Sequence, residues 1–500
     1  MQVRELLDLG VLLQGDPEVV VTGVAYDSRR TRPGDLFVAI RGFRDNGHRY
    51  LEEALQNGAR ALMVEEPLPV PVPLSVPVIR VPSARQALAD AACRLHGHPS
   101  RRLRVIGVTG TNGKTTTTHL IRSILMERGD RVGLVGTVHN YIGDDILPVE
   151  HTTPESADLQ HYLARMVAAG SRYAVMEVSS HALALHRVRG VEFDVGVFTN
   201  LTQDHLDFHR DMDDYRETKG RLFASLGVGA TKPGPRAAVL NADDPASARY
   251  RELCQVPVVT YGLRPGADLW ARDVEVRREG AAFTLVSPQG EVRLRLRLTG
   301  LFNVYNALAA AAVGLVEGVD LATVRRALER TQGVAGRLEP VDAGQPFGVF
   351  VDYAHTPDGL ENVLRTVRAF TEGRIILVFG CGGDRDPAKR PKMGAVAGRL
   401  ADYVIVTSDN PRSEDPEQII AQILAGVRAT PLPPDRYEAE VDRARAIARA
   451  IALAQPGDVV LIAGKGHETY QIFKDRTIPF DDREVARQVL AEQMARRRST

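Results

Sequence analysis

A glycine-rich turn that leads into a lysine and a row of threonines has the clearest chemical meaning in this sequence. It reads VTGTNGKTTTTHL over residues 108–120 and follows the apolar run RLRVIG. In such a turn, backbone N–H groups point toward phosphate, the lysine adds a positive charge, and the next hydroxyl can bind magnesium. Apolar residues then repeat at helical spacing as far as Gly129. We therefore predict a strand, a phosphate-binding turn and a helix.

The turn departs from the common pattern G-x-x-x-x-G-K-[S/T]. That pattern would place a glycine at position 108, where this chain has Val108 and carries Gly110 instead. A chance glycine turn is the weaker alternative, because the strand-like and helix-like flanks are both present. The turn alone does not distinguish a kinase from a ligase or a motor. The residues predicted to hold ATP phosphates are Gly110, Thr111, Asn112, Gly113, Lys114, Thr115 and Thr116.

Two further residues could complete a magnesium site around the Thr115 hydroxyl. Glu177 ends the apolar run in MEVSSHAL, and His205 follows another such run in TNLTQDHLDFH. Magnesium prefers oxygen ligands, so His205 is the less natural member. The alternative is that Glu177 caps a helix and His205 is an ordinary loop histidine, and spacing alone does not decide between the two.

Two more patterns have both a chemical and a plain interpretation. Lys219, in DMDDYRETKGRLF, lies on an acidic, helix-like stretch, where a lysine is usually a solvated surface residue. In DNPR (409–412), Arg412 offers a planar fork for a carboxylate and Asp409 a partner for an ammonium, which suits a zwitterionic amino acid. Without further context, an Asn-Pro turn with a surface arginine is the simpler interpretation.

The elements that must position these residues are short apolar runs ending in polar residues. After RLRVIGVTG come VGLVGT (132–137), YAVMEVSS (173–180), FDVGVFTN (193–200) and AAVLNADD (237–244), with helix-like stretches between them. The C-terminal part repeats the style in GVFVDYAH, RIILVFGCGGDRD, ADYVIVTSDNPR and GDVVLIAGKGHE. This alternation is typical of parallel sheets with crossover helices, and ligands bind such sheets at the carboxyl ends of the strands.

A chain of 500 residues exceeds what one hydrophobic core usually holds. We predict an α/β protein of three domains: a small N-terminal α/β domain over residues 1–100, a central P-loop domain with a parallel sheet over residues 101–333, and a C-terminal Rossmann-like domain over residues 334–500. The proline-dense segment 66–82 is predicted to be a surface loop or an edge segment of the first domain.

Composition argues against several classes of partner. The chain has 63 basic and 63 acidic residues, so we expect neither nucleic acid nor an anionic membrane as its main partner. Three cysteines without a CxxC motif suit a reducing cytosol. The segment MQVRELLDLG lacks the pattern of a signal peptide, and no run of about 18 apolar residues predicts membrane insertion.

The order of the motifs along the chain resembles that of the Mur ligases. The motifs are TGTNGKTT, HTTPE (151–155), EVSSHAL, TNLTQDHLDFH, YRETKGRLF, FNVYNALAA (302–310), GRLE (336–339), VDYAHTPD (351–358), FGCGGDRD (379–386), DNPR and GKGHE (464–468). The segment DSRRTRPGDLFVAIRG (27–42) is similar to the uridine-nucleotide domain of that family. The resemblance therefore covers essentially the whole chain.

The resemblance implies one domain each for a UDP-sugar, ATP and an incoming amino acid. It implies an ATP-dependent amide ligase that adds meso-2,6-diaminopimelate to the D-glutamate of UDP-N-acetylmuramoyl-L-alanyl-D-glutamate, through an acyl phosphate. It also implies Mg²⁺, a cytoplasmic location and, as we expect, a monomer. Lys219 matches the carbamylated lysine of the family, and the catalytic set is Lys114, Lys219, Glu177 and His205. Thr115, Glu177, His205 and the Lys219 carbamate match its metal ligands.

The resemblance also implies three sets of binding residues. Positions that contact the UDP-substrate match Ser28, His48, Thr152, Thr153, Ser179 and Arg187. Nucleotide-side positions match Asn303, Arg337, Asp352 and, as a further candidate, His355. Positions that hold the added amino acid match Arg385, Asp409, Asn410, Pro411, Arg412, Gly464 and Glu468. This chain has His151 where some members carry asparagine and Leu185 where others carry glutamine, so details of the dipeptide pocket differ.

DNPR separates the alternatives within the family. It accompanies meso-diaminopimelate, whose distal carboxylate suits Arg412, whereas L-lysine would leave that arginine without a partner. An L-lysine-adding ligase is thus the nearest alternative. Folylpolyglutamate synthetase would lack the segment DSRRTRPGDLFVAI. A P-loop regulatory protein, from a different class, would not need Lys219, Arg385 and Arg412 together.

Overall fold

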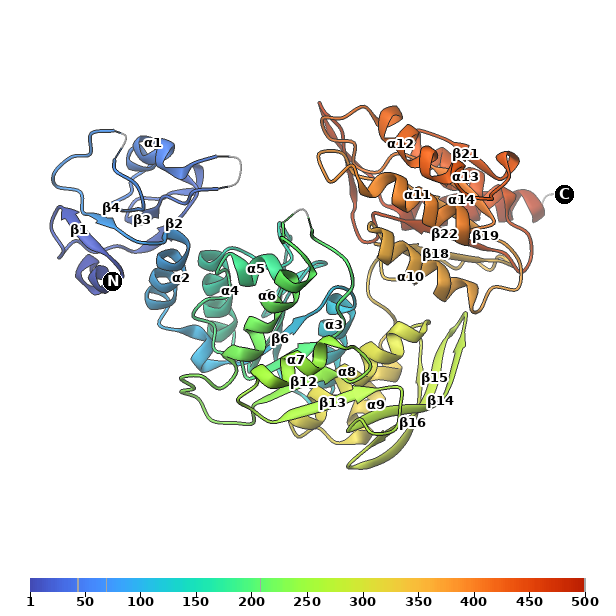
Figure 1. Ribbon diagram of the computed structural model, residues 1–500, viewed down its shortest axis with the longest axis horizontal. Helices are drawn as coiled ribbons and strands as arrows, with labels where there is room; N and C mark the ends of the chain where they lie inside the picture. The colour runs from blue at the N-terminus through green and yellow to red at the C-terminus, as the bar shows by residue number, and fades with distance from the viewer. Residues whose placement is uncertain (43–44, 69, 207, 499–500) are drawn as a thin grey trace.

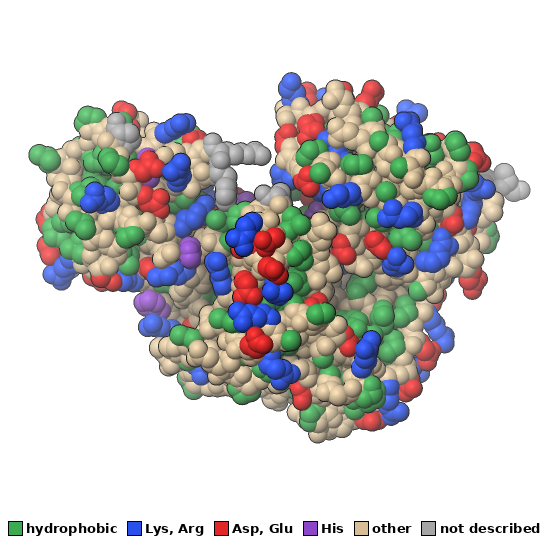
Figure 2. Space-filling view, viewed as in Figure 1, with side chains coloured by type: hydrophobic (Ala, Val, Ile, Leu, Met, Phe, Trp, Pro, Cys, Tyr) green, Lys and Arg blue, Asp and Glu red, His purple; other side chains and the backbone are tan. Residues whose placement is uncertain are grey.

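Three β-sheets divide the chain into three domains (Figure 1). The computed structural model describes residues 1–42, 45–68, 70–206 and 208–498. The N-terminal and C-terminal domains lie on opposite sides above the central domain, and the surface divides into the same three lobes (Figure 2). Acidic and basic side chains are interspersed over the face shown in Figure 2, as the balanced composition predicts. The three-domain α/β architecture expected from the sequence is confirmed.

The N-terminal domain is a five-stranded sheet in the order β1-β5-β4-β3-β2. Strands β2 to β5 run parallel, and β1 pairs antiparallel with β5. Its elements are β1 (Val11–Gln14), β2 (Gly23–Ala25), β3 (Asp35–Val38), α1 (Leu51–Gln56), β4 (Ala61–Val64), β5 (Val78–Arg80) and α2 (Ala84–Leu95), with 3-10 turns at Val3–Leu9, Ser28–Arg30, Gly47–Tyr50 and Pro99–Arg102.

The proline-dense segment 66–82 differs in part from its prediction, because its end forms β5, an inner strand. Within it, residue 69 lies outside the described residues. Val78 and Ile79 are fully buried between two neighbouring strands. No residue of this short strand is a proline, because Pro77 precedes it and Pro82 follows it, so its ladder loses no N–H donor.

The central domain has an eleven-stranded sheet in the order β16-β15-β14-β13-β12-β11-β6-β10-β7-β8-β9. The strands from β14 to β7 in this order are parallel, and antiparallel strands extend both edges. The strands are β6 (Arg104–Thr109), β7 (Val132–Val135), β8 (Asn140–Ile142), β9 (Asp145–Leu147), β10 (Tyr173–Glu177), β11 (Val195–Phe198), β12 (Ala237–Asn241), β13 (Val258–Gly262), β14 (Leu269–Arg277), β15 (Gly280–Ser287) and β16 (Gly290–Leu296). The helices are α3 (Lys114–Glu127), α4 (Ser156–Ala168), α5 (Ser180–Ala184), α6 (Met212–Ser225), α7 (Ala246–Leu253), α8 (Leu301–Val316) and α9 (Leu321–Arg330).

The C-terminal domain has a six-stranded sheet in the order β17-β18-β22-β19-β20-β21, parallel except for β17. Its strands are β17 (Glu339–Pro340), β18 (Gly348–Asp352), β19 (Ile375–Phe379), β20 (Tyr403–Val406), β21 (Tyr437–Ala439) and β22 (Val459–Ala463), with the hairpin β23 (Tyr470–Ile472) and β24 (Thr477–Pro479). The helices are α10 (Pro357–Arg368), α11 (Lys389–Leu400), α12 (Pro416–Arg428), α13 (Arg443–Leu453) and α14 (Asp482–Arg498), with a 3-10 turn at Pro434–Arg436.

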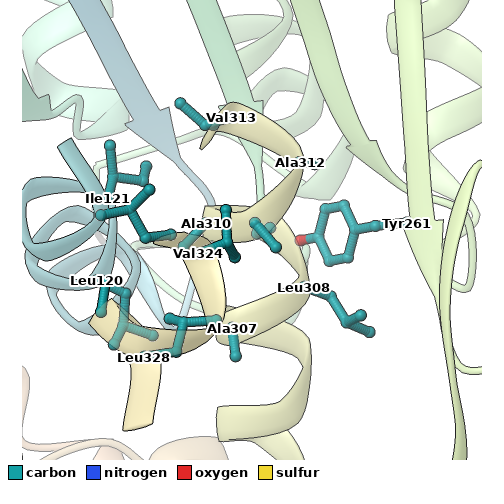
Figure 3. Packing of buried hydrophobic residues seen from close by; sticks show 14 of the residues in the cluster. Leu120, Ile121, Tyr261, Ala307, Leu308, Ala310, Ala312, Val313, Val324 and Leu328 are labelled. Carbon is teal, nitrogen blue, oxygen red and sulfur yellow. The ribbon is translucent and has the colours of Figure 1, made fainter. Parts of the chain in front are cut away.

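Helix α3, which begins at the predicted phosphate-binding turn, is held in place by apolar packing. Leu120 and Ile121 on its inner face are essentially fully buried. They pack against residues of α8 and α9 such as Ala307, Val324 and Leu328 (Figure 3). Burial of a leucine or isoleucine side chain stabilises a fold by about 1.5–3 kcal/mol. This packing fixes the helix end that faces the turn.

A search for membrane-crossing helices in the described part of the chain finds none that is both long and apolar enough.

Candidate active site

Three neighbouring strands bring the central-domain site residues to one sheet edge. β6 lies between β10 and β11, with Glu177 paired to Val108 and Phe198 paired to Thr109. Parallel strands end on the same side, so the phosphate-binding turn, Glu177 and the loop after β11 are adjacent. The sequence-based expectation that polar residues collect at this edge is confirmed.

The turn from Gly110 to Gly113 requires glycine at both ends. Gly110 has a φ of 149° and Gly113 a φ of 85°. A Cβ atom at Gly110 would lie 1.9 Å from Thr199 Oγ1, and one at Gly113 would lie 2.4 Å from Asn306 Oδ1. The first N–H groups of an α-helix have no intrahelical acceptor, and at the start of α3 no side-chain cap accepts from them either. These groups are available to phosphate oxygens.

The loop after β11 holds the turn in this shape. Thr111 N donates to Asn200 O at 2.8 Å, and Asn112 N donates to Asn200 Oδ1 at 2.9 Å. In return, Thr199 Oγ1 donates to Asn112 O at 2.6 Å. Hydrogen bonds from Thr199 and Asn200 therefore fix the shape of the turn.

Two lysines share one carbonyl oxygen of the turn. Lys114 Nζ and Lys219 Nζ each donate to Gly110 O at 2.9 Å, and Lys114 Nζ also donates to Thr111 O at 2.7 Å. Lys219 is 1% exposed, and Tyr215 packs one helical turn away with its ring centroid 4.4 Å from Lys219 Nζ. The solvated surface position that the acidic stretch favours for Lys219 is therefore wrong.

Burial sets the charge state of Lys219. Desolvation lowers the pKa of Lys219 well below its usual value, the nearby Lys114 ammonium lowers it further, and Asp204 opposes the shift. Burial also lowers the pKa of Lys114. Repulsion between two ammonium groups this close acts in the same direction as the burial of Lys219, and both favour its neutral amine.

Glu177 is the centre of a group of oxygen atoms. The side chain is buried, and it accepts hydrogen bonds from Thr115 Oγ1 at 3.1 Å, from Thr137 N at 2.7 Å and from Thr137 Oγ1 at 3.0 Å. A carboxylate and a hydroxyl are oxygen ligands of the type that Mg²⁺ prefers. In the part of the chain that the structure describes, no group of three or more His, Cys, Asp or Glu side chains could hold a metal ion by itself. Thr115 and Glu177 therefore fit an ion that also takes ligands from phosphate and water.

His205 lies apart from the Glu177 hydrogen bonds. Its Nε2 atom lies 3.4 Å from Asp204 Oδ2, and its ring packs edge-on to the His181 ring at a centroid distance of 4.8 Å. It lines the cavity between the central and C-terminal domains.

Four residues predicted to contact the UDP-substrate lie around Glu177. Thr153 Oγ1 donates to Glu177 O at 2.9 Å and accepts from Ser179 N at 3.1 Å. Arg187 donates to Thr153 O at 3.1 Å, and the hydroxyl oxygens of Thr137 and Thr152 lie 3.2 Å apart. Thr152, Thr153, Ser179 and Arg187 thus form one connected group.

The other two predicted UDP-substrate residues, Ser28 and His48, lie in the N-terminal domain. Ser28 Oγ donates to Glu53 Oε2 at 2.7 Å. His48 Nε2 accepts from the backbone N–H groups of Glu65 and Glu66, so Nδ1 carries the proton and donates to Asn46 Oδ1 at 2.8 Å. Burial lowers the pKa of His48, which keeps the ring neutral. In this structure the His48 ring orders its own loop.

The predicted nucleotide-side residues divide between two domains. Asn303 is buried on α8, where its Nδ2 group donates to Thr299 O at 2.8 Å. Arg337 reaches from the C-terminal side to donate to Thr115 Oγ1 at 3.1 Å, with its guanidinium 4.8 Å from the Tyr353 ring centroid. Arg337 therefore links the C-terminal domain to the predicted magnesium ligand.

Asp352 and His355 occupy the end of β18. Asp352 accepts from Leu338 N at 2.7 Å and from Ala354 N at 2.8 Å, and burial raises its pKa while Arg337 opposes that shift. His355 Nδ1 lies 2.8 Å from Tyr353 O, and its side chain lines the cavity.

The predicted amino-acid residues meet where β20 and β22 end. Asp409 is buried, and a Cβ atom at Gly464 would lie 2.7 Å from its Oδ2 atom. Asn410 Nδ2 donates to Glu468 Oε2 at 2.8 Å. Arg412 has a φ of 53°, and its side chain donates to Gly383 O at 2.8 Å. Arg412 is half-buried, so the structure differs from the simpler interpretation of DNPR in the exposure expected for a surface arginine.

A cavity of about 890 Å³ joins the two sets of loops. Arg385, which donates to Asp384 O at 3.1 Å, lines it together with Arg412, and Pro411 lies buried behind them. Predicted site residues in its wall are Thr152, His205, His355, Arg385, Asp409, Asn410, Arg412, Gly464 and Glu468. Ser28 and His48 are not among the described residues that line it.

Sequence reasoning missed several residues that contact the predicted site. Thr137 donates to Glu177, Asn306 accepts from Thr117 Oγ1 beside the phosphate-binding turn, and Lys465 donates to Asn410 and Glu468. Lys465 stands inside the motif GKGHE, which was a signal in the sequence. Asn306 stands inside the motif FNVYNALAA and Thr137 ends the run VGLVGT, but only the fold shows that they contact the predicted site.

Comparisons with known proteins find similarity along most of the chain. The Mur ligase middle domain matches residues 108–314, the Mur ligase glutamate ligase domain matches residues 336–466, and the model described as Mur ligase family, catalytic domain, matches residues 20–96. A UDP-N-acetylmuramoyl-L-alanyl-D-glutamate–2,6-diaminopimelate ligase from Geobacillus thermodenitrificans is 50% identical over 478 residues, 96% of each chain. A protein of the same name from Bacillus velezensis is 49% identical over 477 residues, 95% of each chain. A solved structure of a ligase with that name superposes with a TM-score of 0.68 at 34% identity, covering 99% of both chains.

Proposed function

This chain belongs to the Mur ligase family, and on that premise we propose that it joins meso-2,6-diaminopimelate to the D-glutamate of UDP-N-acetylmuramoyl-L-alanyl-D-glutamate. The reaction consumes ATP and forms an amide, ADP and phosphate. The structural observation that best supports this is one cavity between the central and C-terminal domains. The C-terminal domain contributes Asp409 and Arg412 to its wall, and the opposite wall belongs to the central domain, which carries the predicted phosphate-binding turn. Such a cavity can bring an activated carboxyl group and an amine together.

The three domains divide the substrates. We assign the UDP-sugar to residues 1–100, ATP to residues 101–333 and the amino acid to residues 334–500. Ser28 and His48 would contact the uridine end of the substrate, and the group around Thr153 and Arg187 would contact its dipeptide. A monomeric state and a cytoplasmic location remain predictions.

The first chemical step is phosphoryl transfer. The γ-carboxylate of D-glutamate attacks the γ-phosphate of ATP in line, and ADP leaves. The Lys114 ammonium and the N–H groups at the start of α3 stabilise the negative charge on the phosphate oxygens. When bound at Thr115 and Glu177, Mg²⁺ supplies further positive charge to the same oxygens.

The second step forms the amide. The amine of diaminopimelate attacks the acyl phosphate, loses a proton and releases phosphate. An acyl phosphate reacts with water, so the two domains must enclose the cavity during this step. Arg337 and its hydrogen bond to Thr115 already connect the C-terminal domain to the site of phosphoryl transfer.

Lys219 has the properties that carbamylation needs. A neutral amine adds to carbon dioxide to give a carbamate and a proton, and burial lowers the pKa of Lys219, which favours the neutral amine. The carbamate would add an anionic oxygen ligand for a second magnesium ion, with His205 nearby in the cavity wall. This proposal gives a function to a lysine that has no solvent contact.

Arg412 accounts for the choice of amino acid. Its planar guanidinium suits the distal carboxylate of diaminopimelate, which L-lysine lacks. With L-lysine bound, the arginine would be enclosed without an anionic partner, and that arrangement costs free energy. We therefore assign diaminopimelate rather than L-lysine.

Phosphate release measured with ATP, magnesium and the UDP-dipeptide tests the proposal, with meso-diaminopimelate or L-lysine added in parallel. Release is expected with diaminopimelate and at least about 100-fold less with L-lysine. Release with L-lysine alone would refute the role of Arg412, and release with neither amino acid would refute the ligase assignment. In the same assay, Lys219→Met should release no phosphate above background, and full activity of that variant would refute the carbamate.

A further inference from the structure

A buried lysine in the amino-acid site has no part in the mechanism described above. Lys465 follows Gly464 at the end of β22 and is 0% exposed. Its Nζ atom donates to Asn410 Oδ1 at 3.1 Å and to Glu468 Oε2 at 3.0 Å. A buried ammonium is costly unless it is paired, and these two contacts pair it.

The same contacts determine which way the Asn410 amide points. Asn410 Oδ1 accepts from Lys465 Nζ and, at 3.0 Å, from Ile472 N, while Asn410 Nδ2 donates to Glu468 Oε2 at 2.8 Å. A flipped amide would turn its NH₂ group toward an ammonium and a backbone N–H, with no acceptor for either of its hydrogens. Lys465 therefore excludes the flipped orientation.

Lys465 also determines how Glu468 is presented. Both Lys465 Nζ and Asn410 Nδ2 donate to the same carboxylate oxygen, Oε2. The Glu468 side chain is 15% exposed and lines the cavity, so its other oxygen can face a ligand. The Lys465 charge offsets one of the two negative charges that Asp409 and Glu468 bring to this end of the cavity.

We propose that Lys465 is a positioning residue for the incoming amino acid, which it does not itself touch, and that it contributes to the selection of a distal centre bearing both an ammonium and a carboxylate. The inference rests on the proposed function, because it takes Asn410 and Glu468 as amino-acid ligands. With Lys465 present, the two carboxylates of Asp409 and Glu468 are opposed by the positive charges of Lys465, Arg385 and Arg412. Without its charge, the site is more negative by one, which disfavours the diaminopimelate carboxylate and favours the side chain of L-lysine.

The test compares Lys465→Met, which keeps the length of the side chain without its charge, with the wild-type full-length enzyme. Lys474→Met is the matched control, because Lys474 is an exposed lysine in the turn between β23 and β24. For Lys465→Met, KM for diaminopimelate should rise about 10- to 100-fold, as expected for lost charge-assisted hydrogen bonds. KM for ATP and for the UDP-dipeptide should change less than about 3-fold, and Lys474→Met should match the wild type.

Two further readouts separate positioning from a structural role. The ratio of kcat/KM for diaminopimelate to that for L-lysine should fall in Lys465→Met. In a double-mutant cycle with Glu468→Gln, the two effects on the KM for diaminopimelate should be less than multiplicative, because Lys465 acts through Glu468. Lys465→Gln, which keeps an N–H donor, should give an intermediate KM.

Several results would overturn the inference. These are an unchanged KM for diaminopimelate in a folded Lys465→Met enzyme, an equal rise in all three KM values, fully multiplicative effects in the cycle, or failure of both Lys465 variants to fold. Absence of diaminopimelate-dependent turnover in the wild type would instead refute the proposed function. The two failures are therefore distinguishable.

Discussion

At the scale of single residues, burial decides which ionisable groups around α3 carry a charge. Lys219 is one case, and His119 on α3 is another. The His119 ring packs edge-on to Tyr141 at a centroid distance of 6.1 Å, and its Nε2 atom is buried without a hydrogen-bond partner among the described residues. Burial lowers the pKa of His119 to about 4, with smaller contributions from Arg122 and His139. A neutral imidazole is therefore part of the native packing.

The lowered pKa of His119 predicts that the central domain becomes less stable in mild acid. Below pH 6.5 the unfolded chain binds a proton at this position, while the folded chain does not until pH reaches about 4. The stabilisation is thus fully present above pH 6.5 and decreases as pH falls, by about 2 kcal/mol between pH 6.5 and 5. His119→Phe should lose this part of the pH dependence.

Urea unfolding followed by the fluorescence of Trp270 measures the effect. This single tryptophan lies on β14, in the sheet of the central domain, the domain that also contains His119. The difference in unfolding free energy between pH 7.5 and pH 5 should be smaller in His119→Phe than in the wild type. His151→Phe, at an exposed histidine, should keep the wild-type difference. Identical pH dependence in all three proteins would contradict the assignment.

Residue types in the motifs were enough to predict a phosphate-binding turn and to nominate Glu177 as a site residue, but not to predict what surrounds either of them. The burial of Lys219 depends on how α6 packs beside the turn, and an acidic, helix-like sequence gives the opposite impression. Thr137 reaches Glu177 because β7 and β10 are paired, a contact between positions far apart in the chain. Such contacts follow from sheet order, which a local pattern does not contain.

At the scale of elements, the linker before β17 is packed against the turn after β22. Gly336 has a φ of 66°, and a Cβ atom there would lie 2.1 Å from His467 N and 2.3 Å from the Gly466 carbonyl carbon. Arg337, the next residue, donates to Thr115. The close approach at Gly336 therefore fixes where Arg337 begins its reach toward the phosphate-binding turn.

Gly336→Ala should lower the free energy of unfolding more than the same substitution at a glycine that has a positive φ but open space around it. Gly344 has a φ of 86° with open space around it, so Gly344→Ala should cost about 1–2 kcal/mol from the left-handed backbone. Gly336→Ala adds overlap with backbone atoms, and we expect a total of about 3–5 kcal/mol. Scanning calorimetry of both variants measures the difference. Gly336→Ala should also raise the KM for ATP, and equal effects of the two variants would count against this account.

The elements predicted from the sequence were those with continuous apolar runs. Such runs mark strands buried on both faces, and β6, β7, β10, β11, β12, β18, β19, β20 and β22 were found this way. The hairpins β14 to β16 were missed because one of their faces is more exposed, so their residues alternate in burial instead of forming a run. β5 was assigned to a surface loop or an edge segment, because three residues after a proline-rich stretch carry little signal.

At the scale of the whole molecule, a few polar contacts join each outer domain to the central one. On the N-terminal side, Arg85 pairs with Glu155 at 3.2 Å, and Glu155 in turn pairs with Arg187. On the C-terminal side, Asp358 of α10 accepts from Asn112 Nδ2 at 2.8 Å and from Thr202 Oγ1 at 2.7 Å. Each of these contacts involves a predicted site residue, Arg187 on one side and Asn112 on the other. A movement of an outer domain would therefore displace residues of the predicted site.

Asp358 provides the test of that coupling. Asp358→Ala removes both hydrogen bonds between α10 and the loops of the central domain, while Asp358→Asn keeps an acceptor oxygen. Asn362→Ala is the control, because Asn362 contacts Asp358 from within the same helix and crosses no domain boundary.

In Asp358→Ala we expect the radius of gyration from small-angle X-ray scattering to increase and ATP turnover with both acceptors to fall about 10-fold. ATP affinity should change less than about 3-fold, because the backbone N–H and carbonyl groups of Asn112 keep their hydrogen bonds to the loop after β11 when its side chain loses Asp358. A larger loss of ATP affinity than of turnover would mean that Asp358 shapes the turn itself, and unchanged scattering and turnover would mean that the domains hold their positions without it.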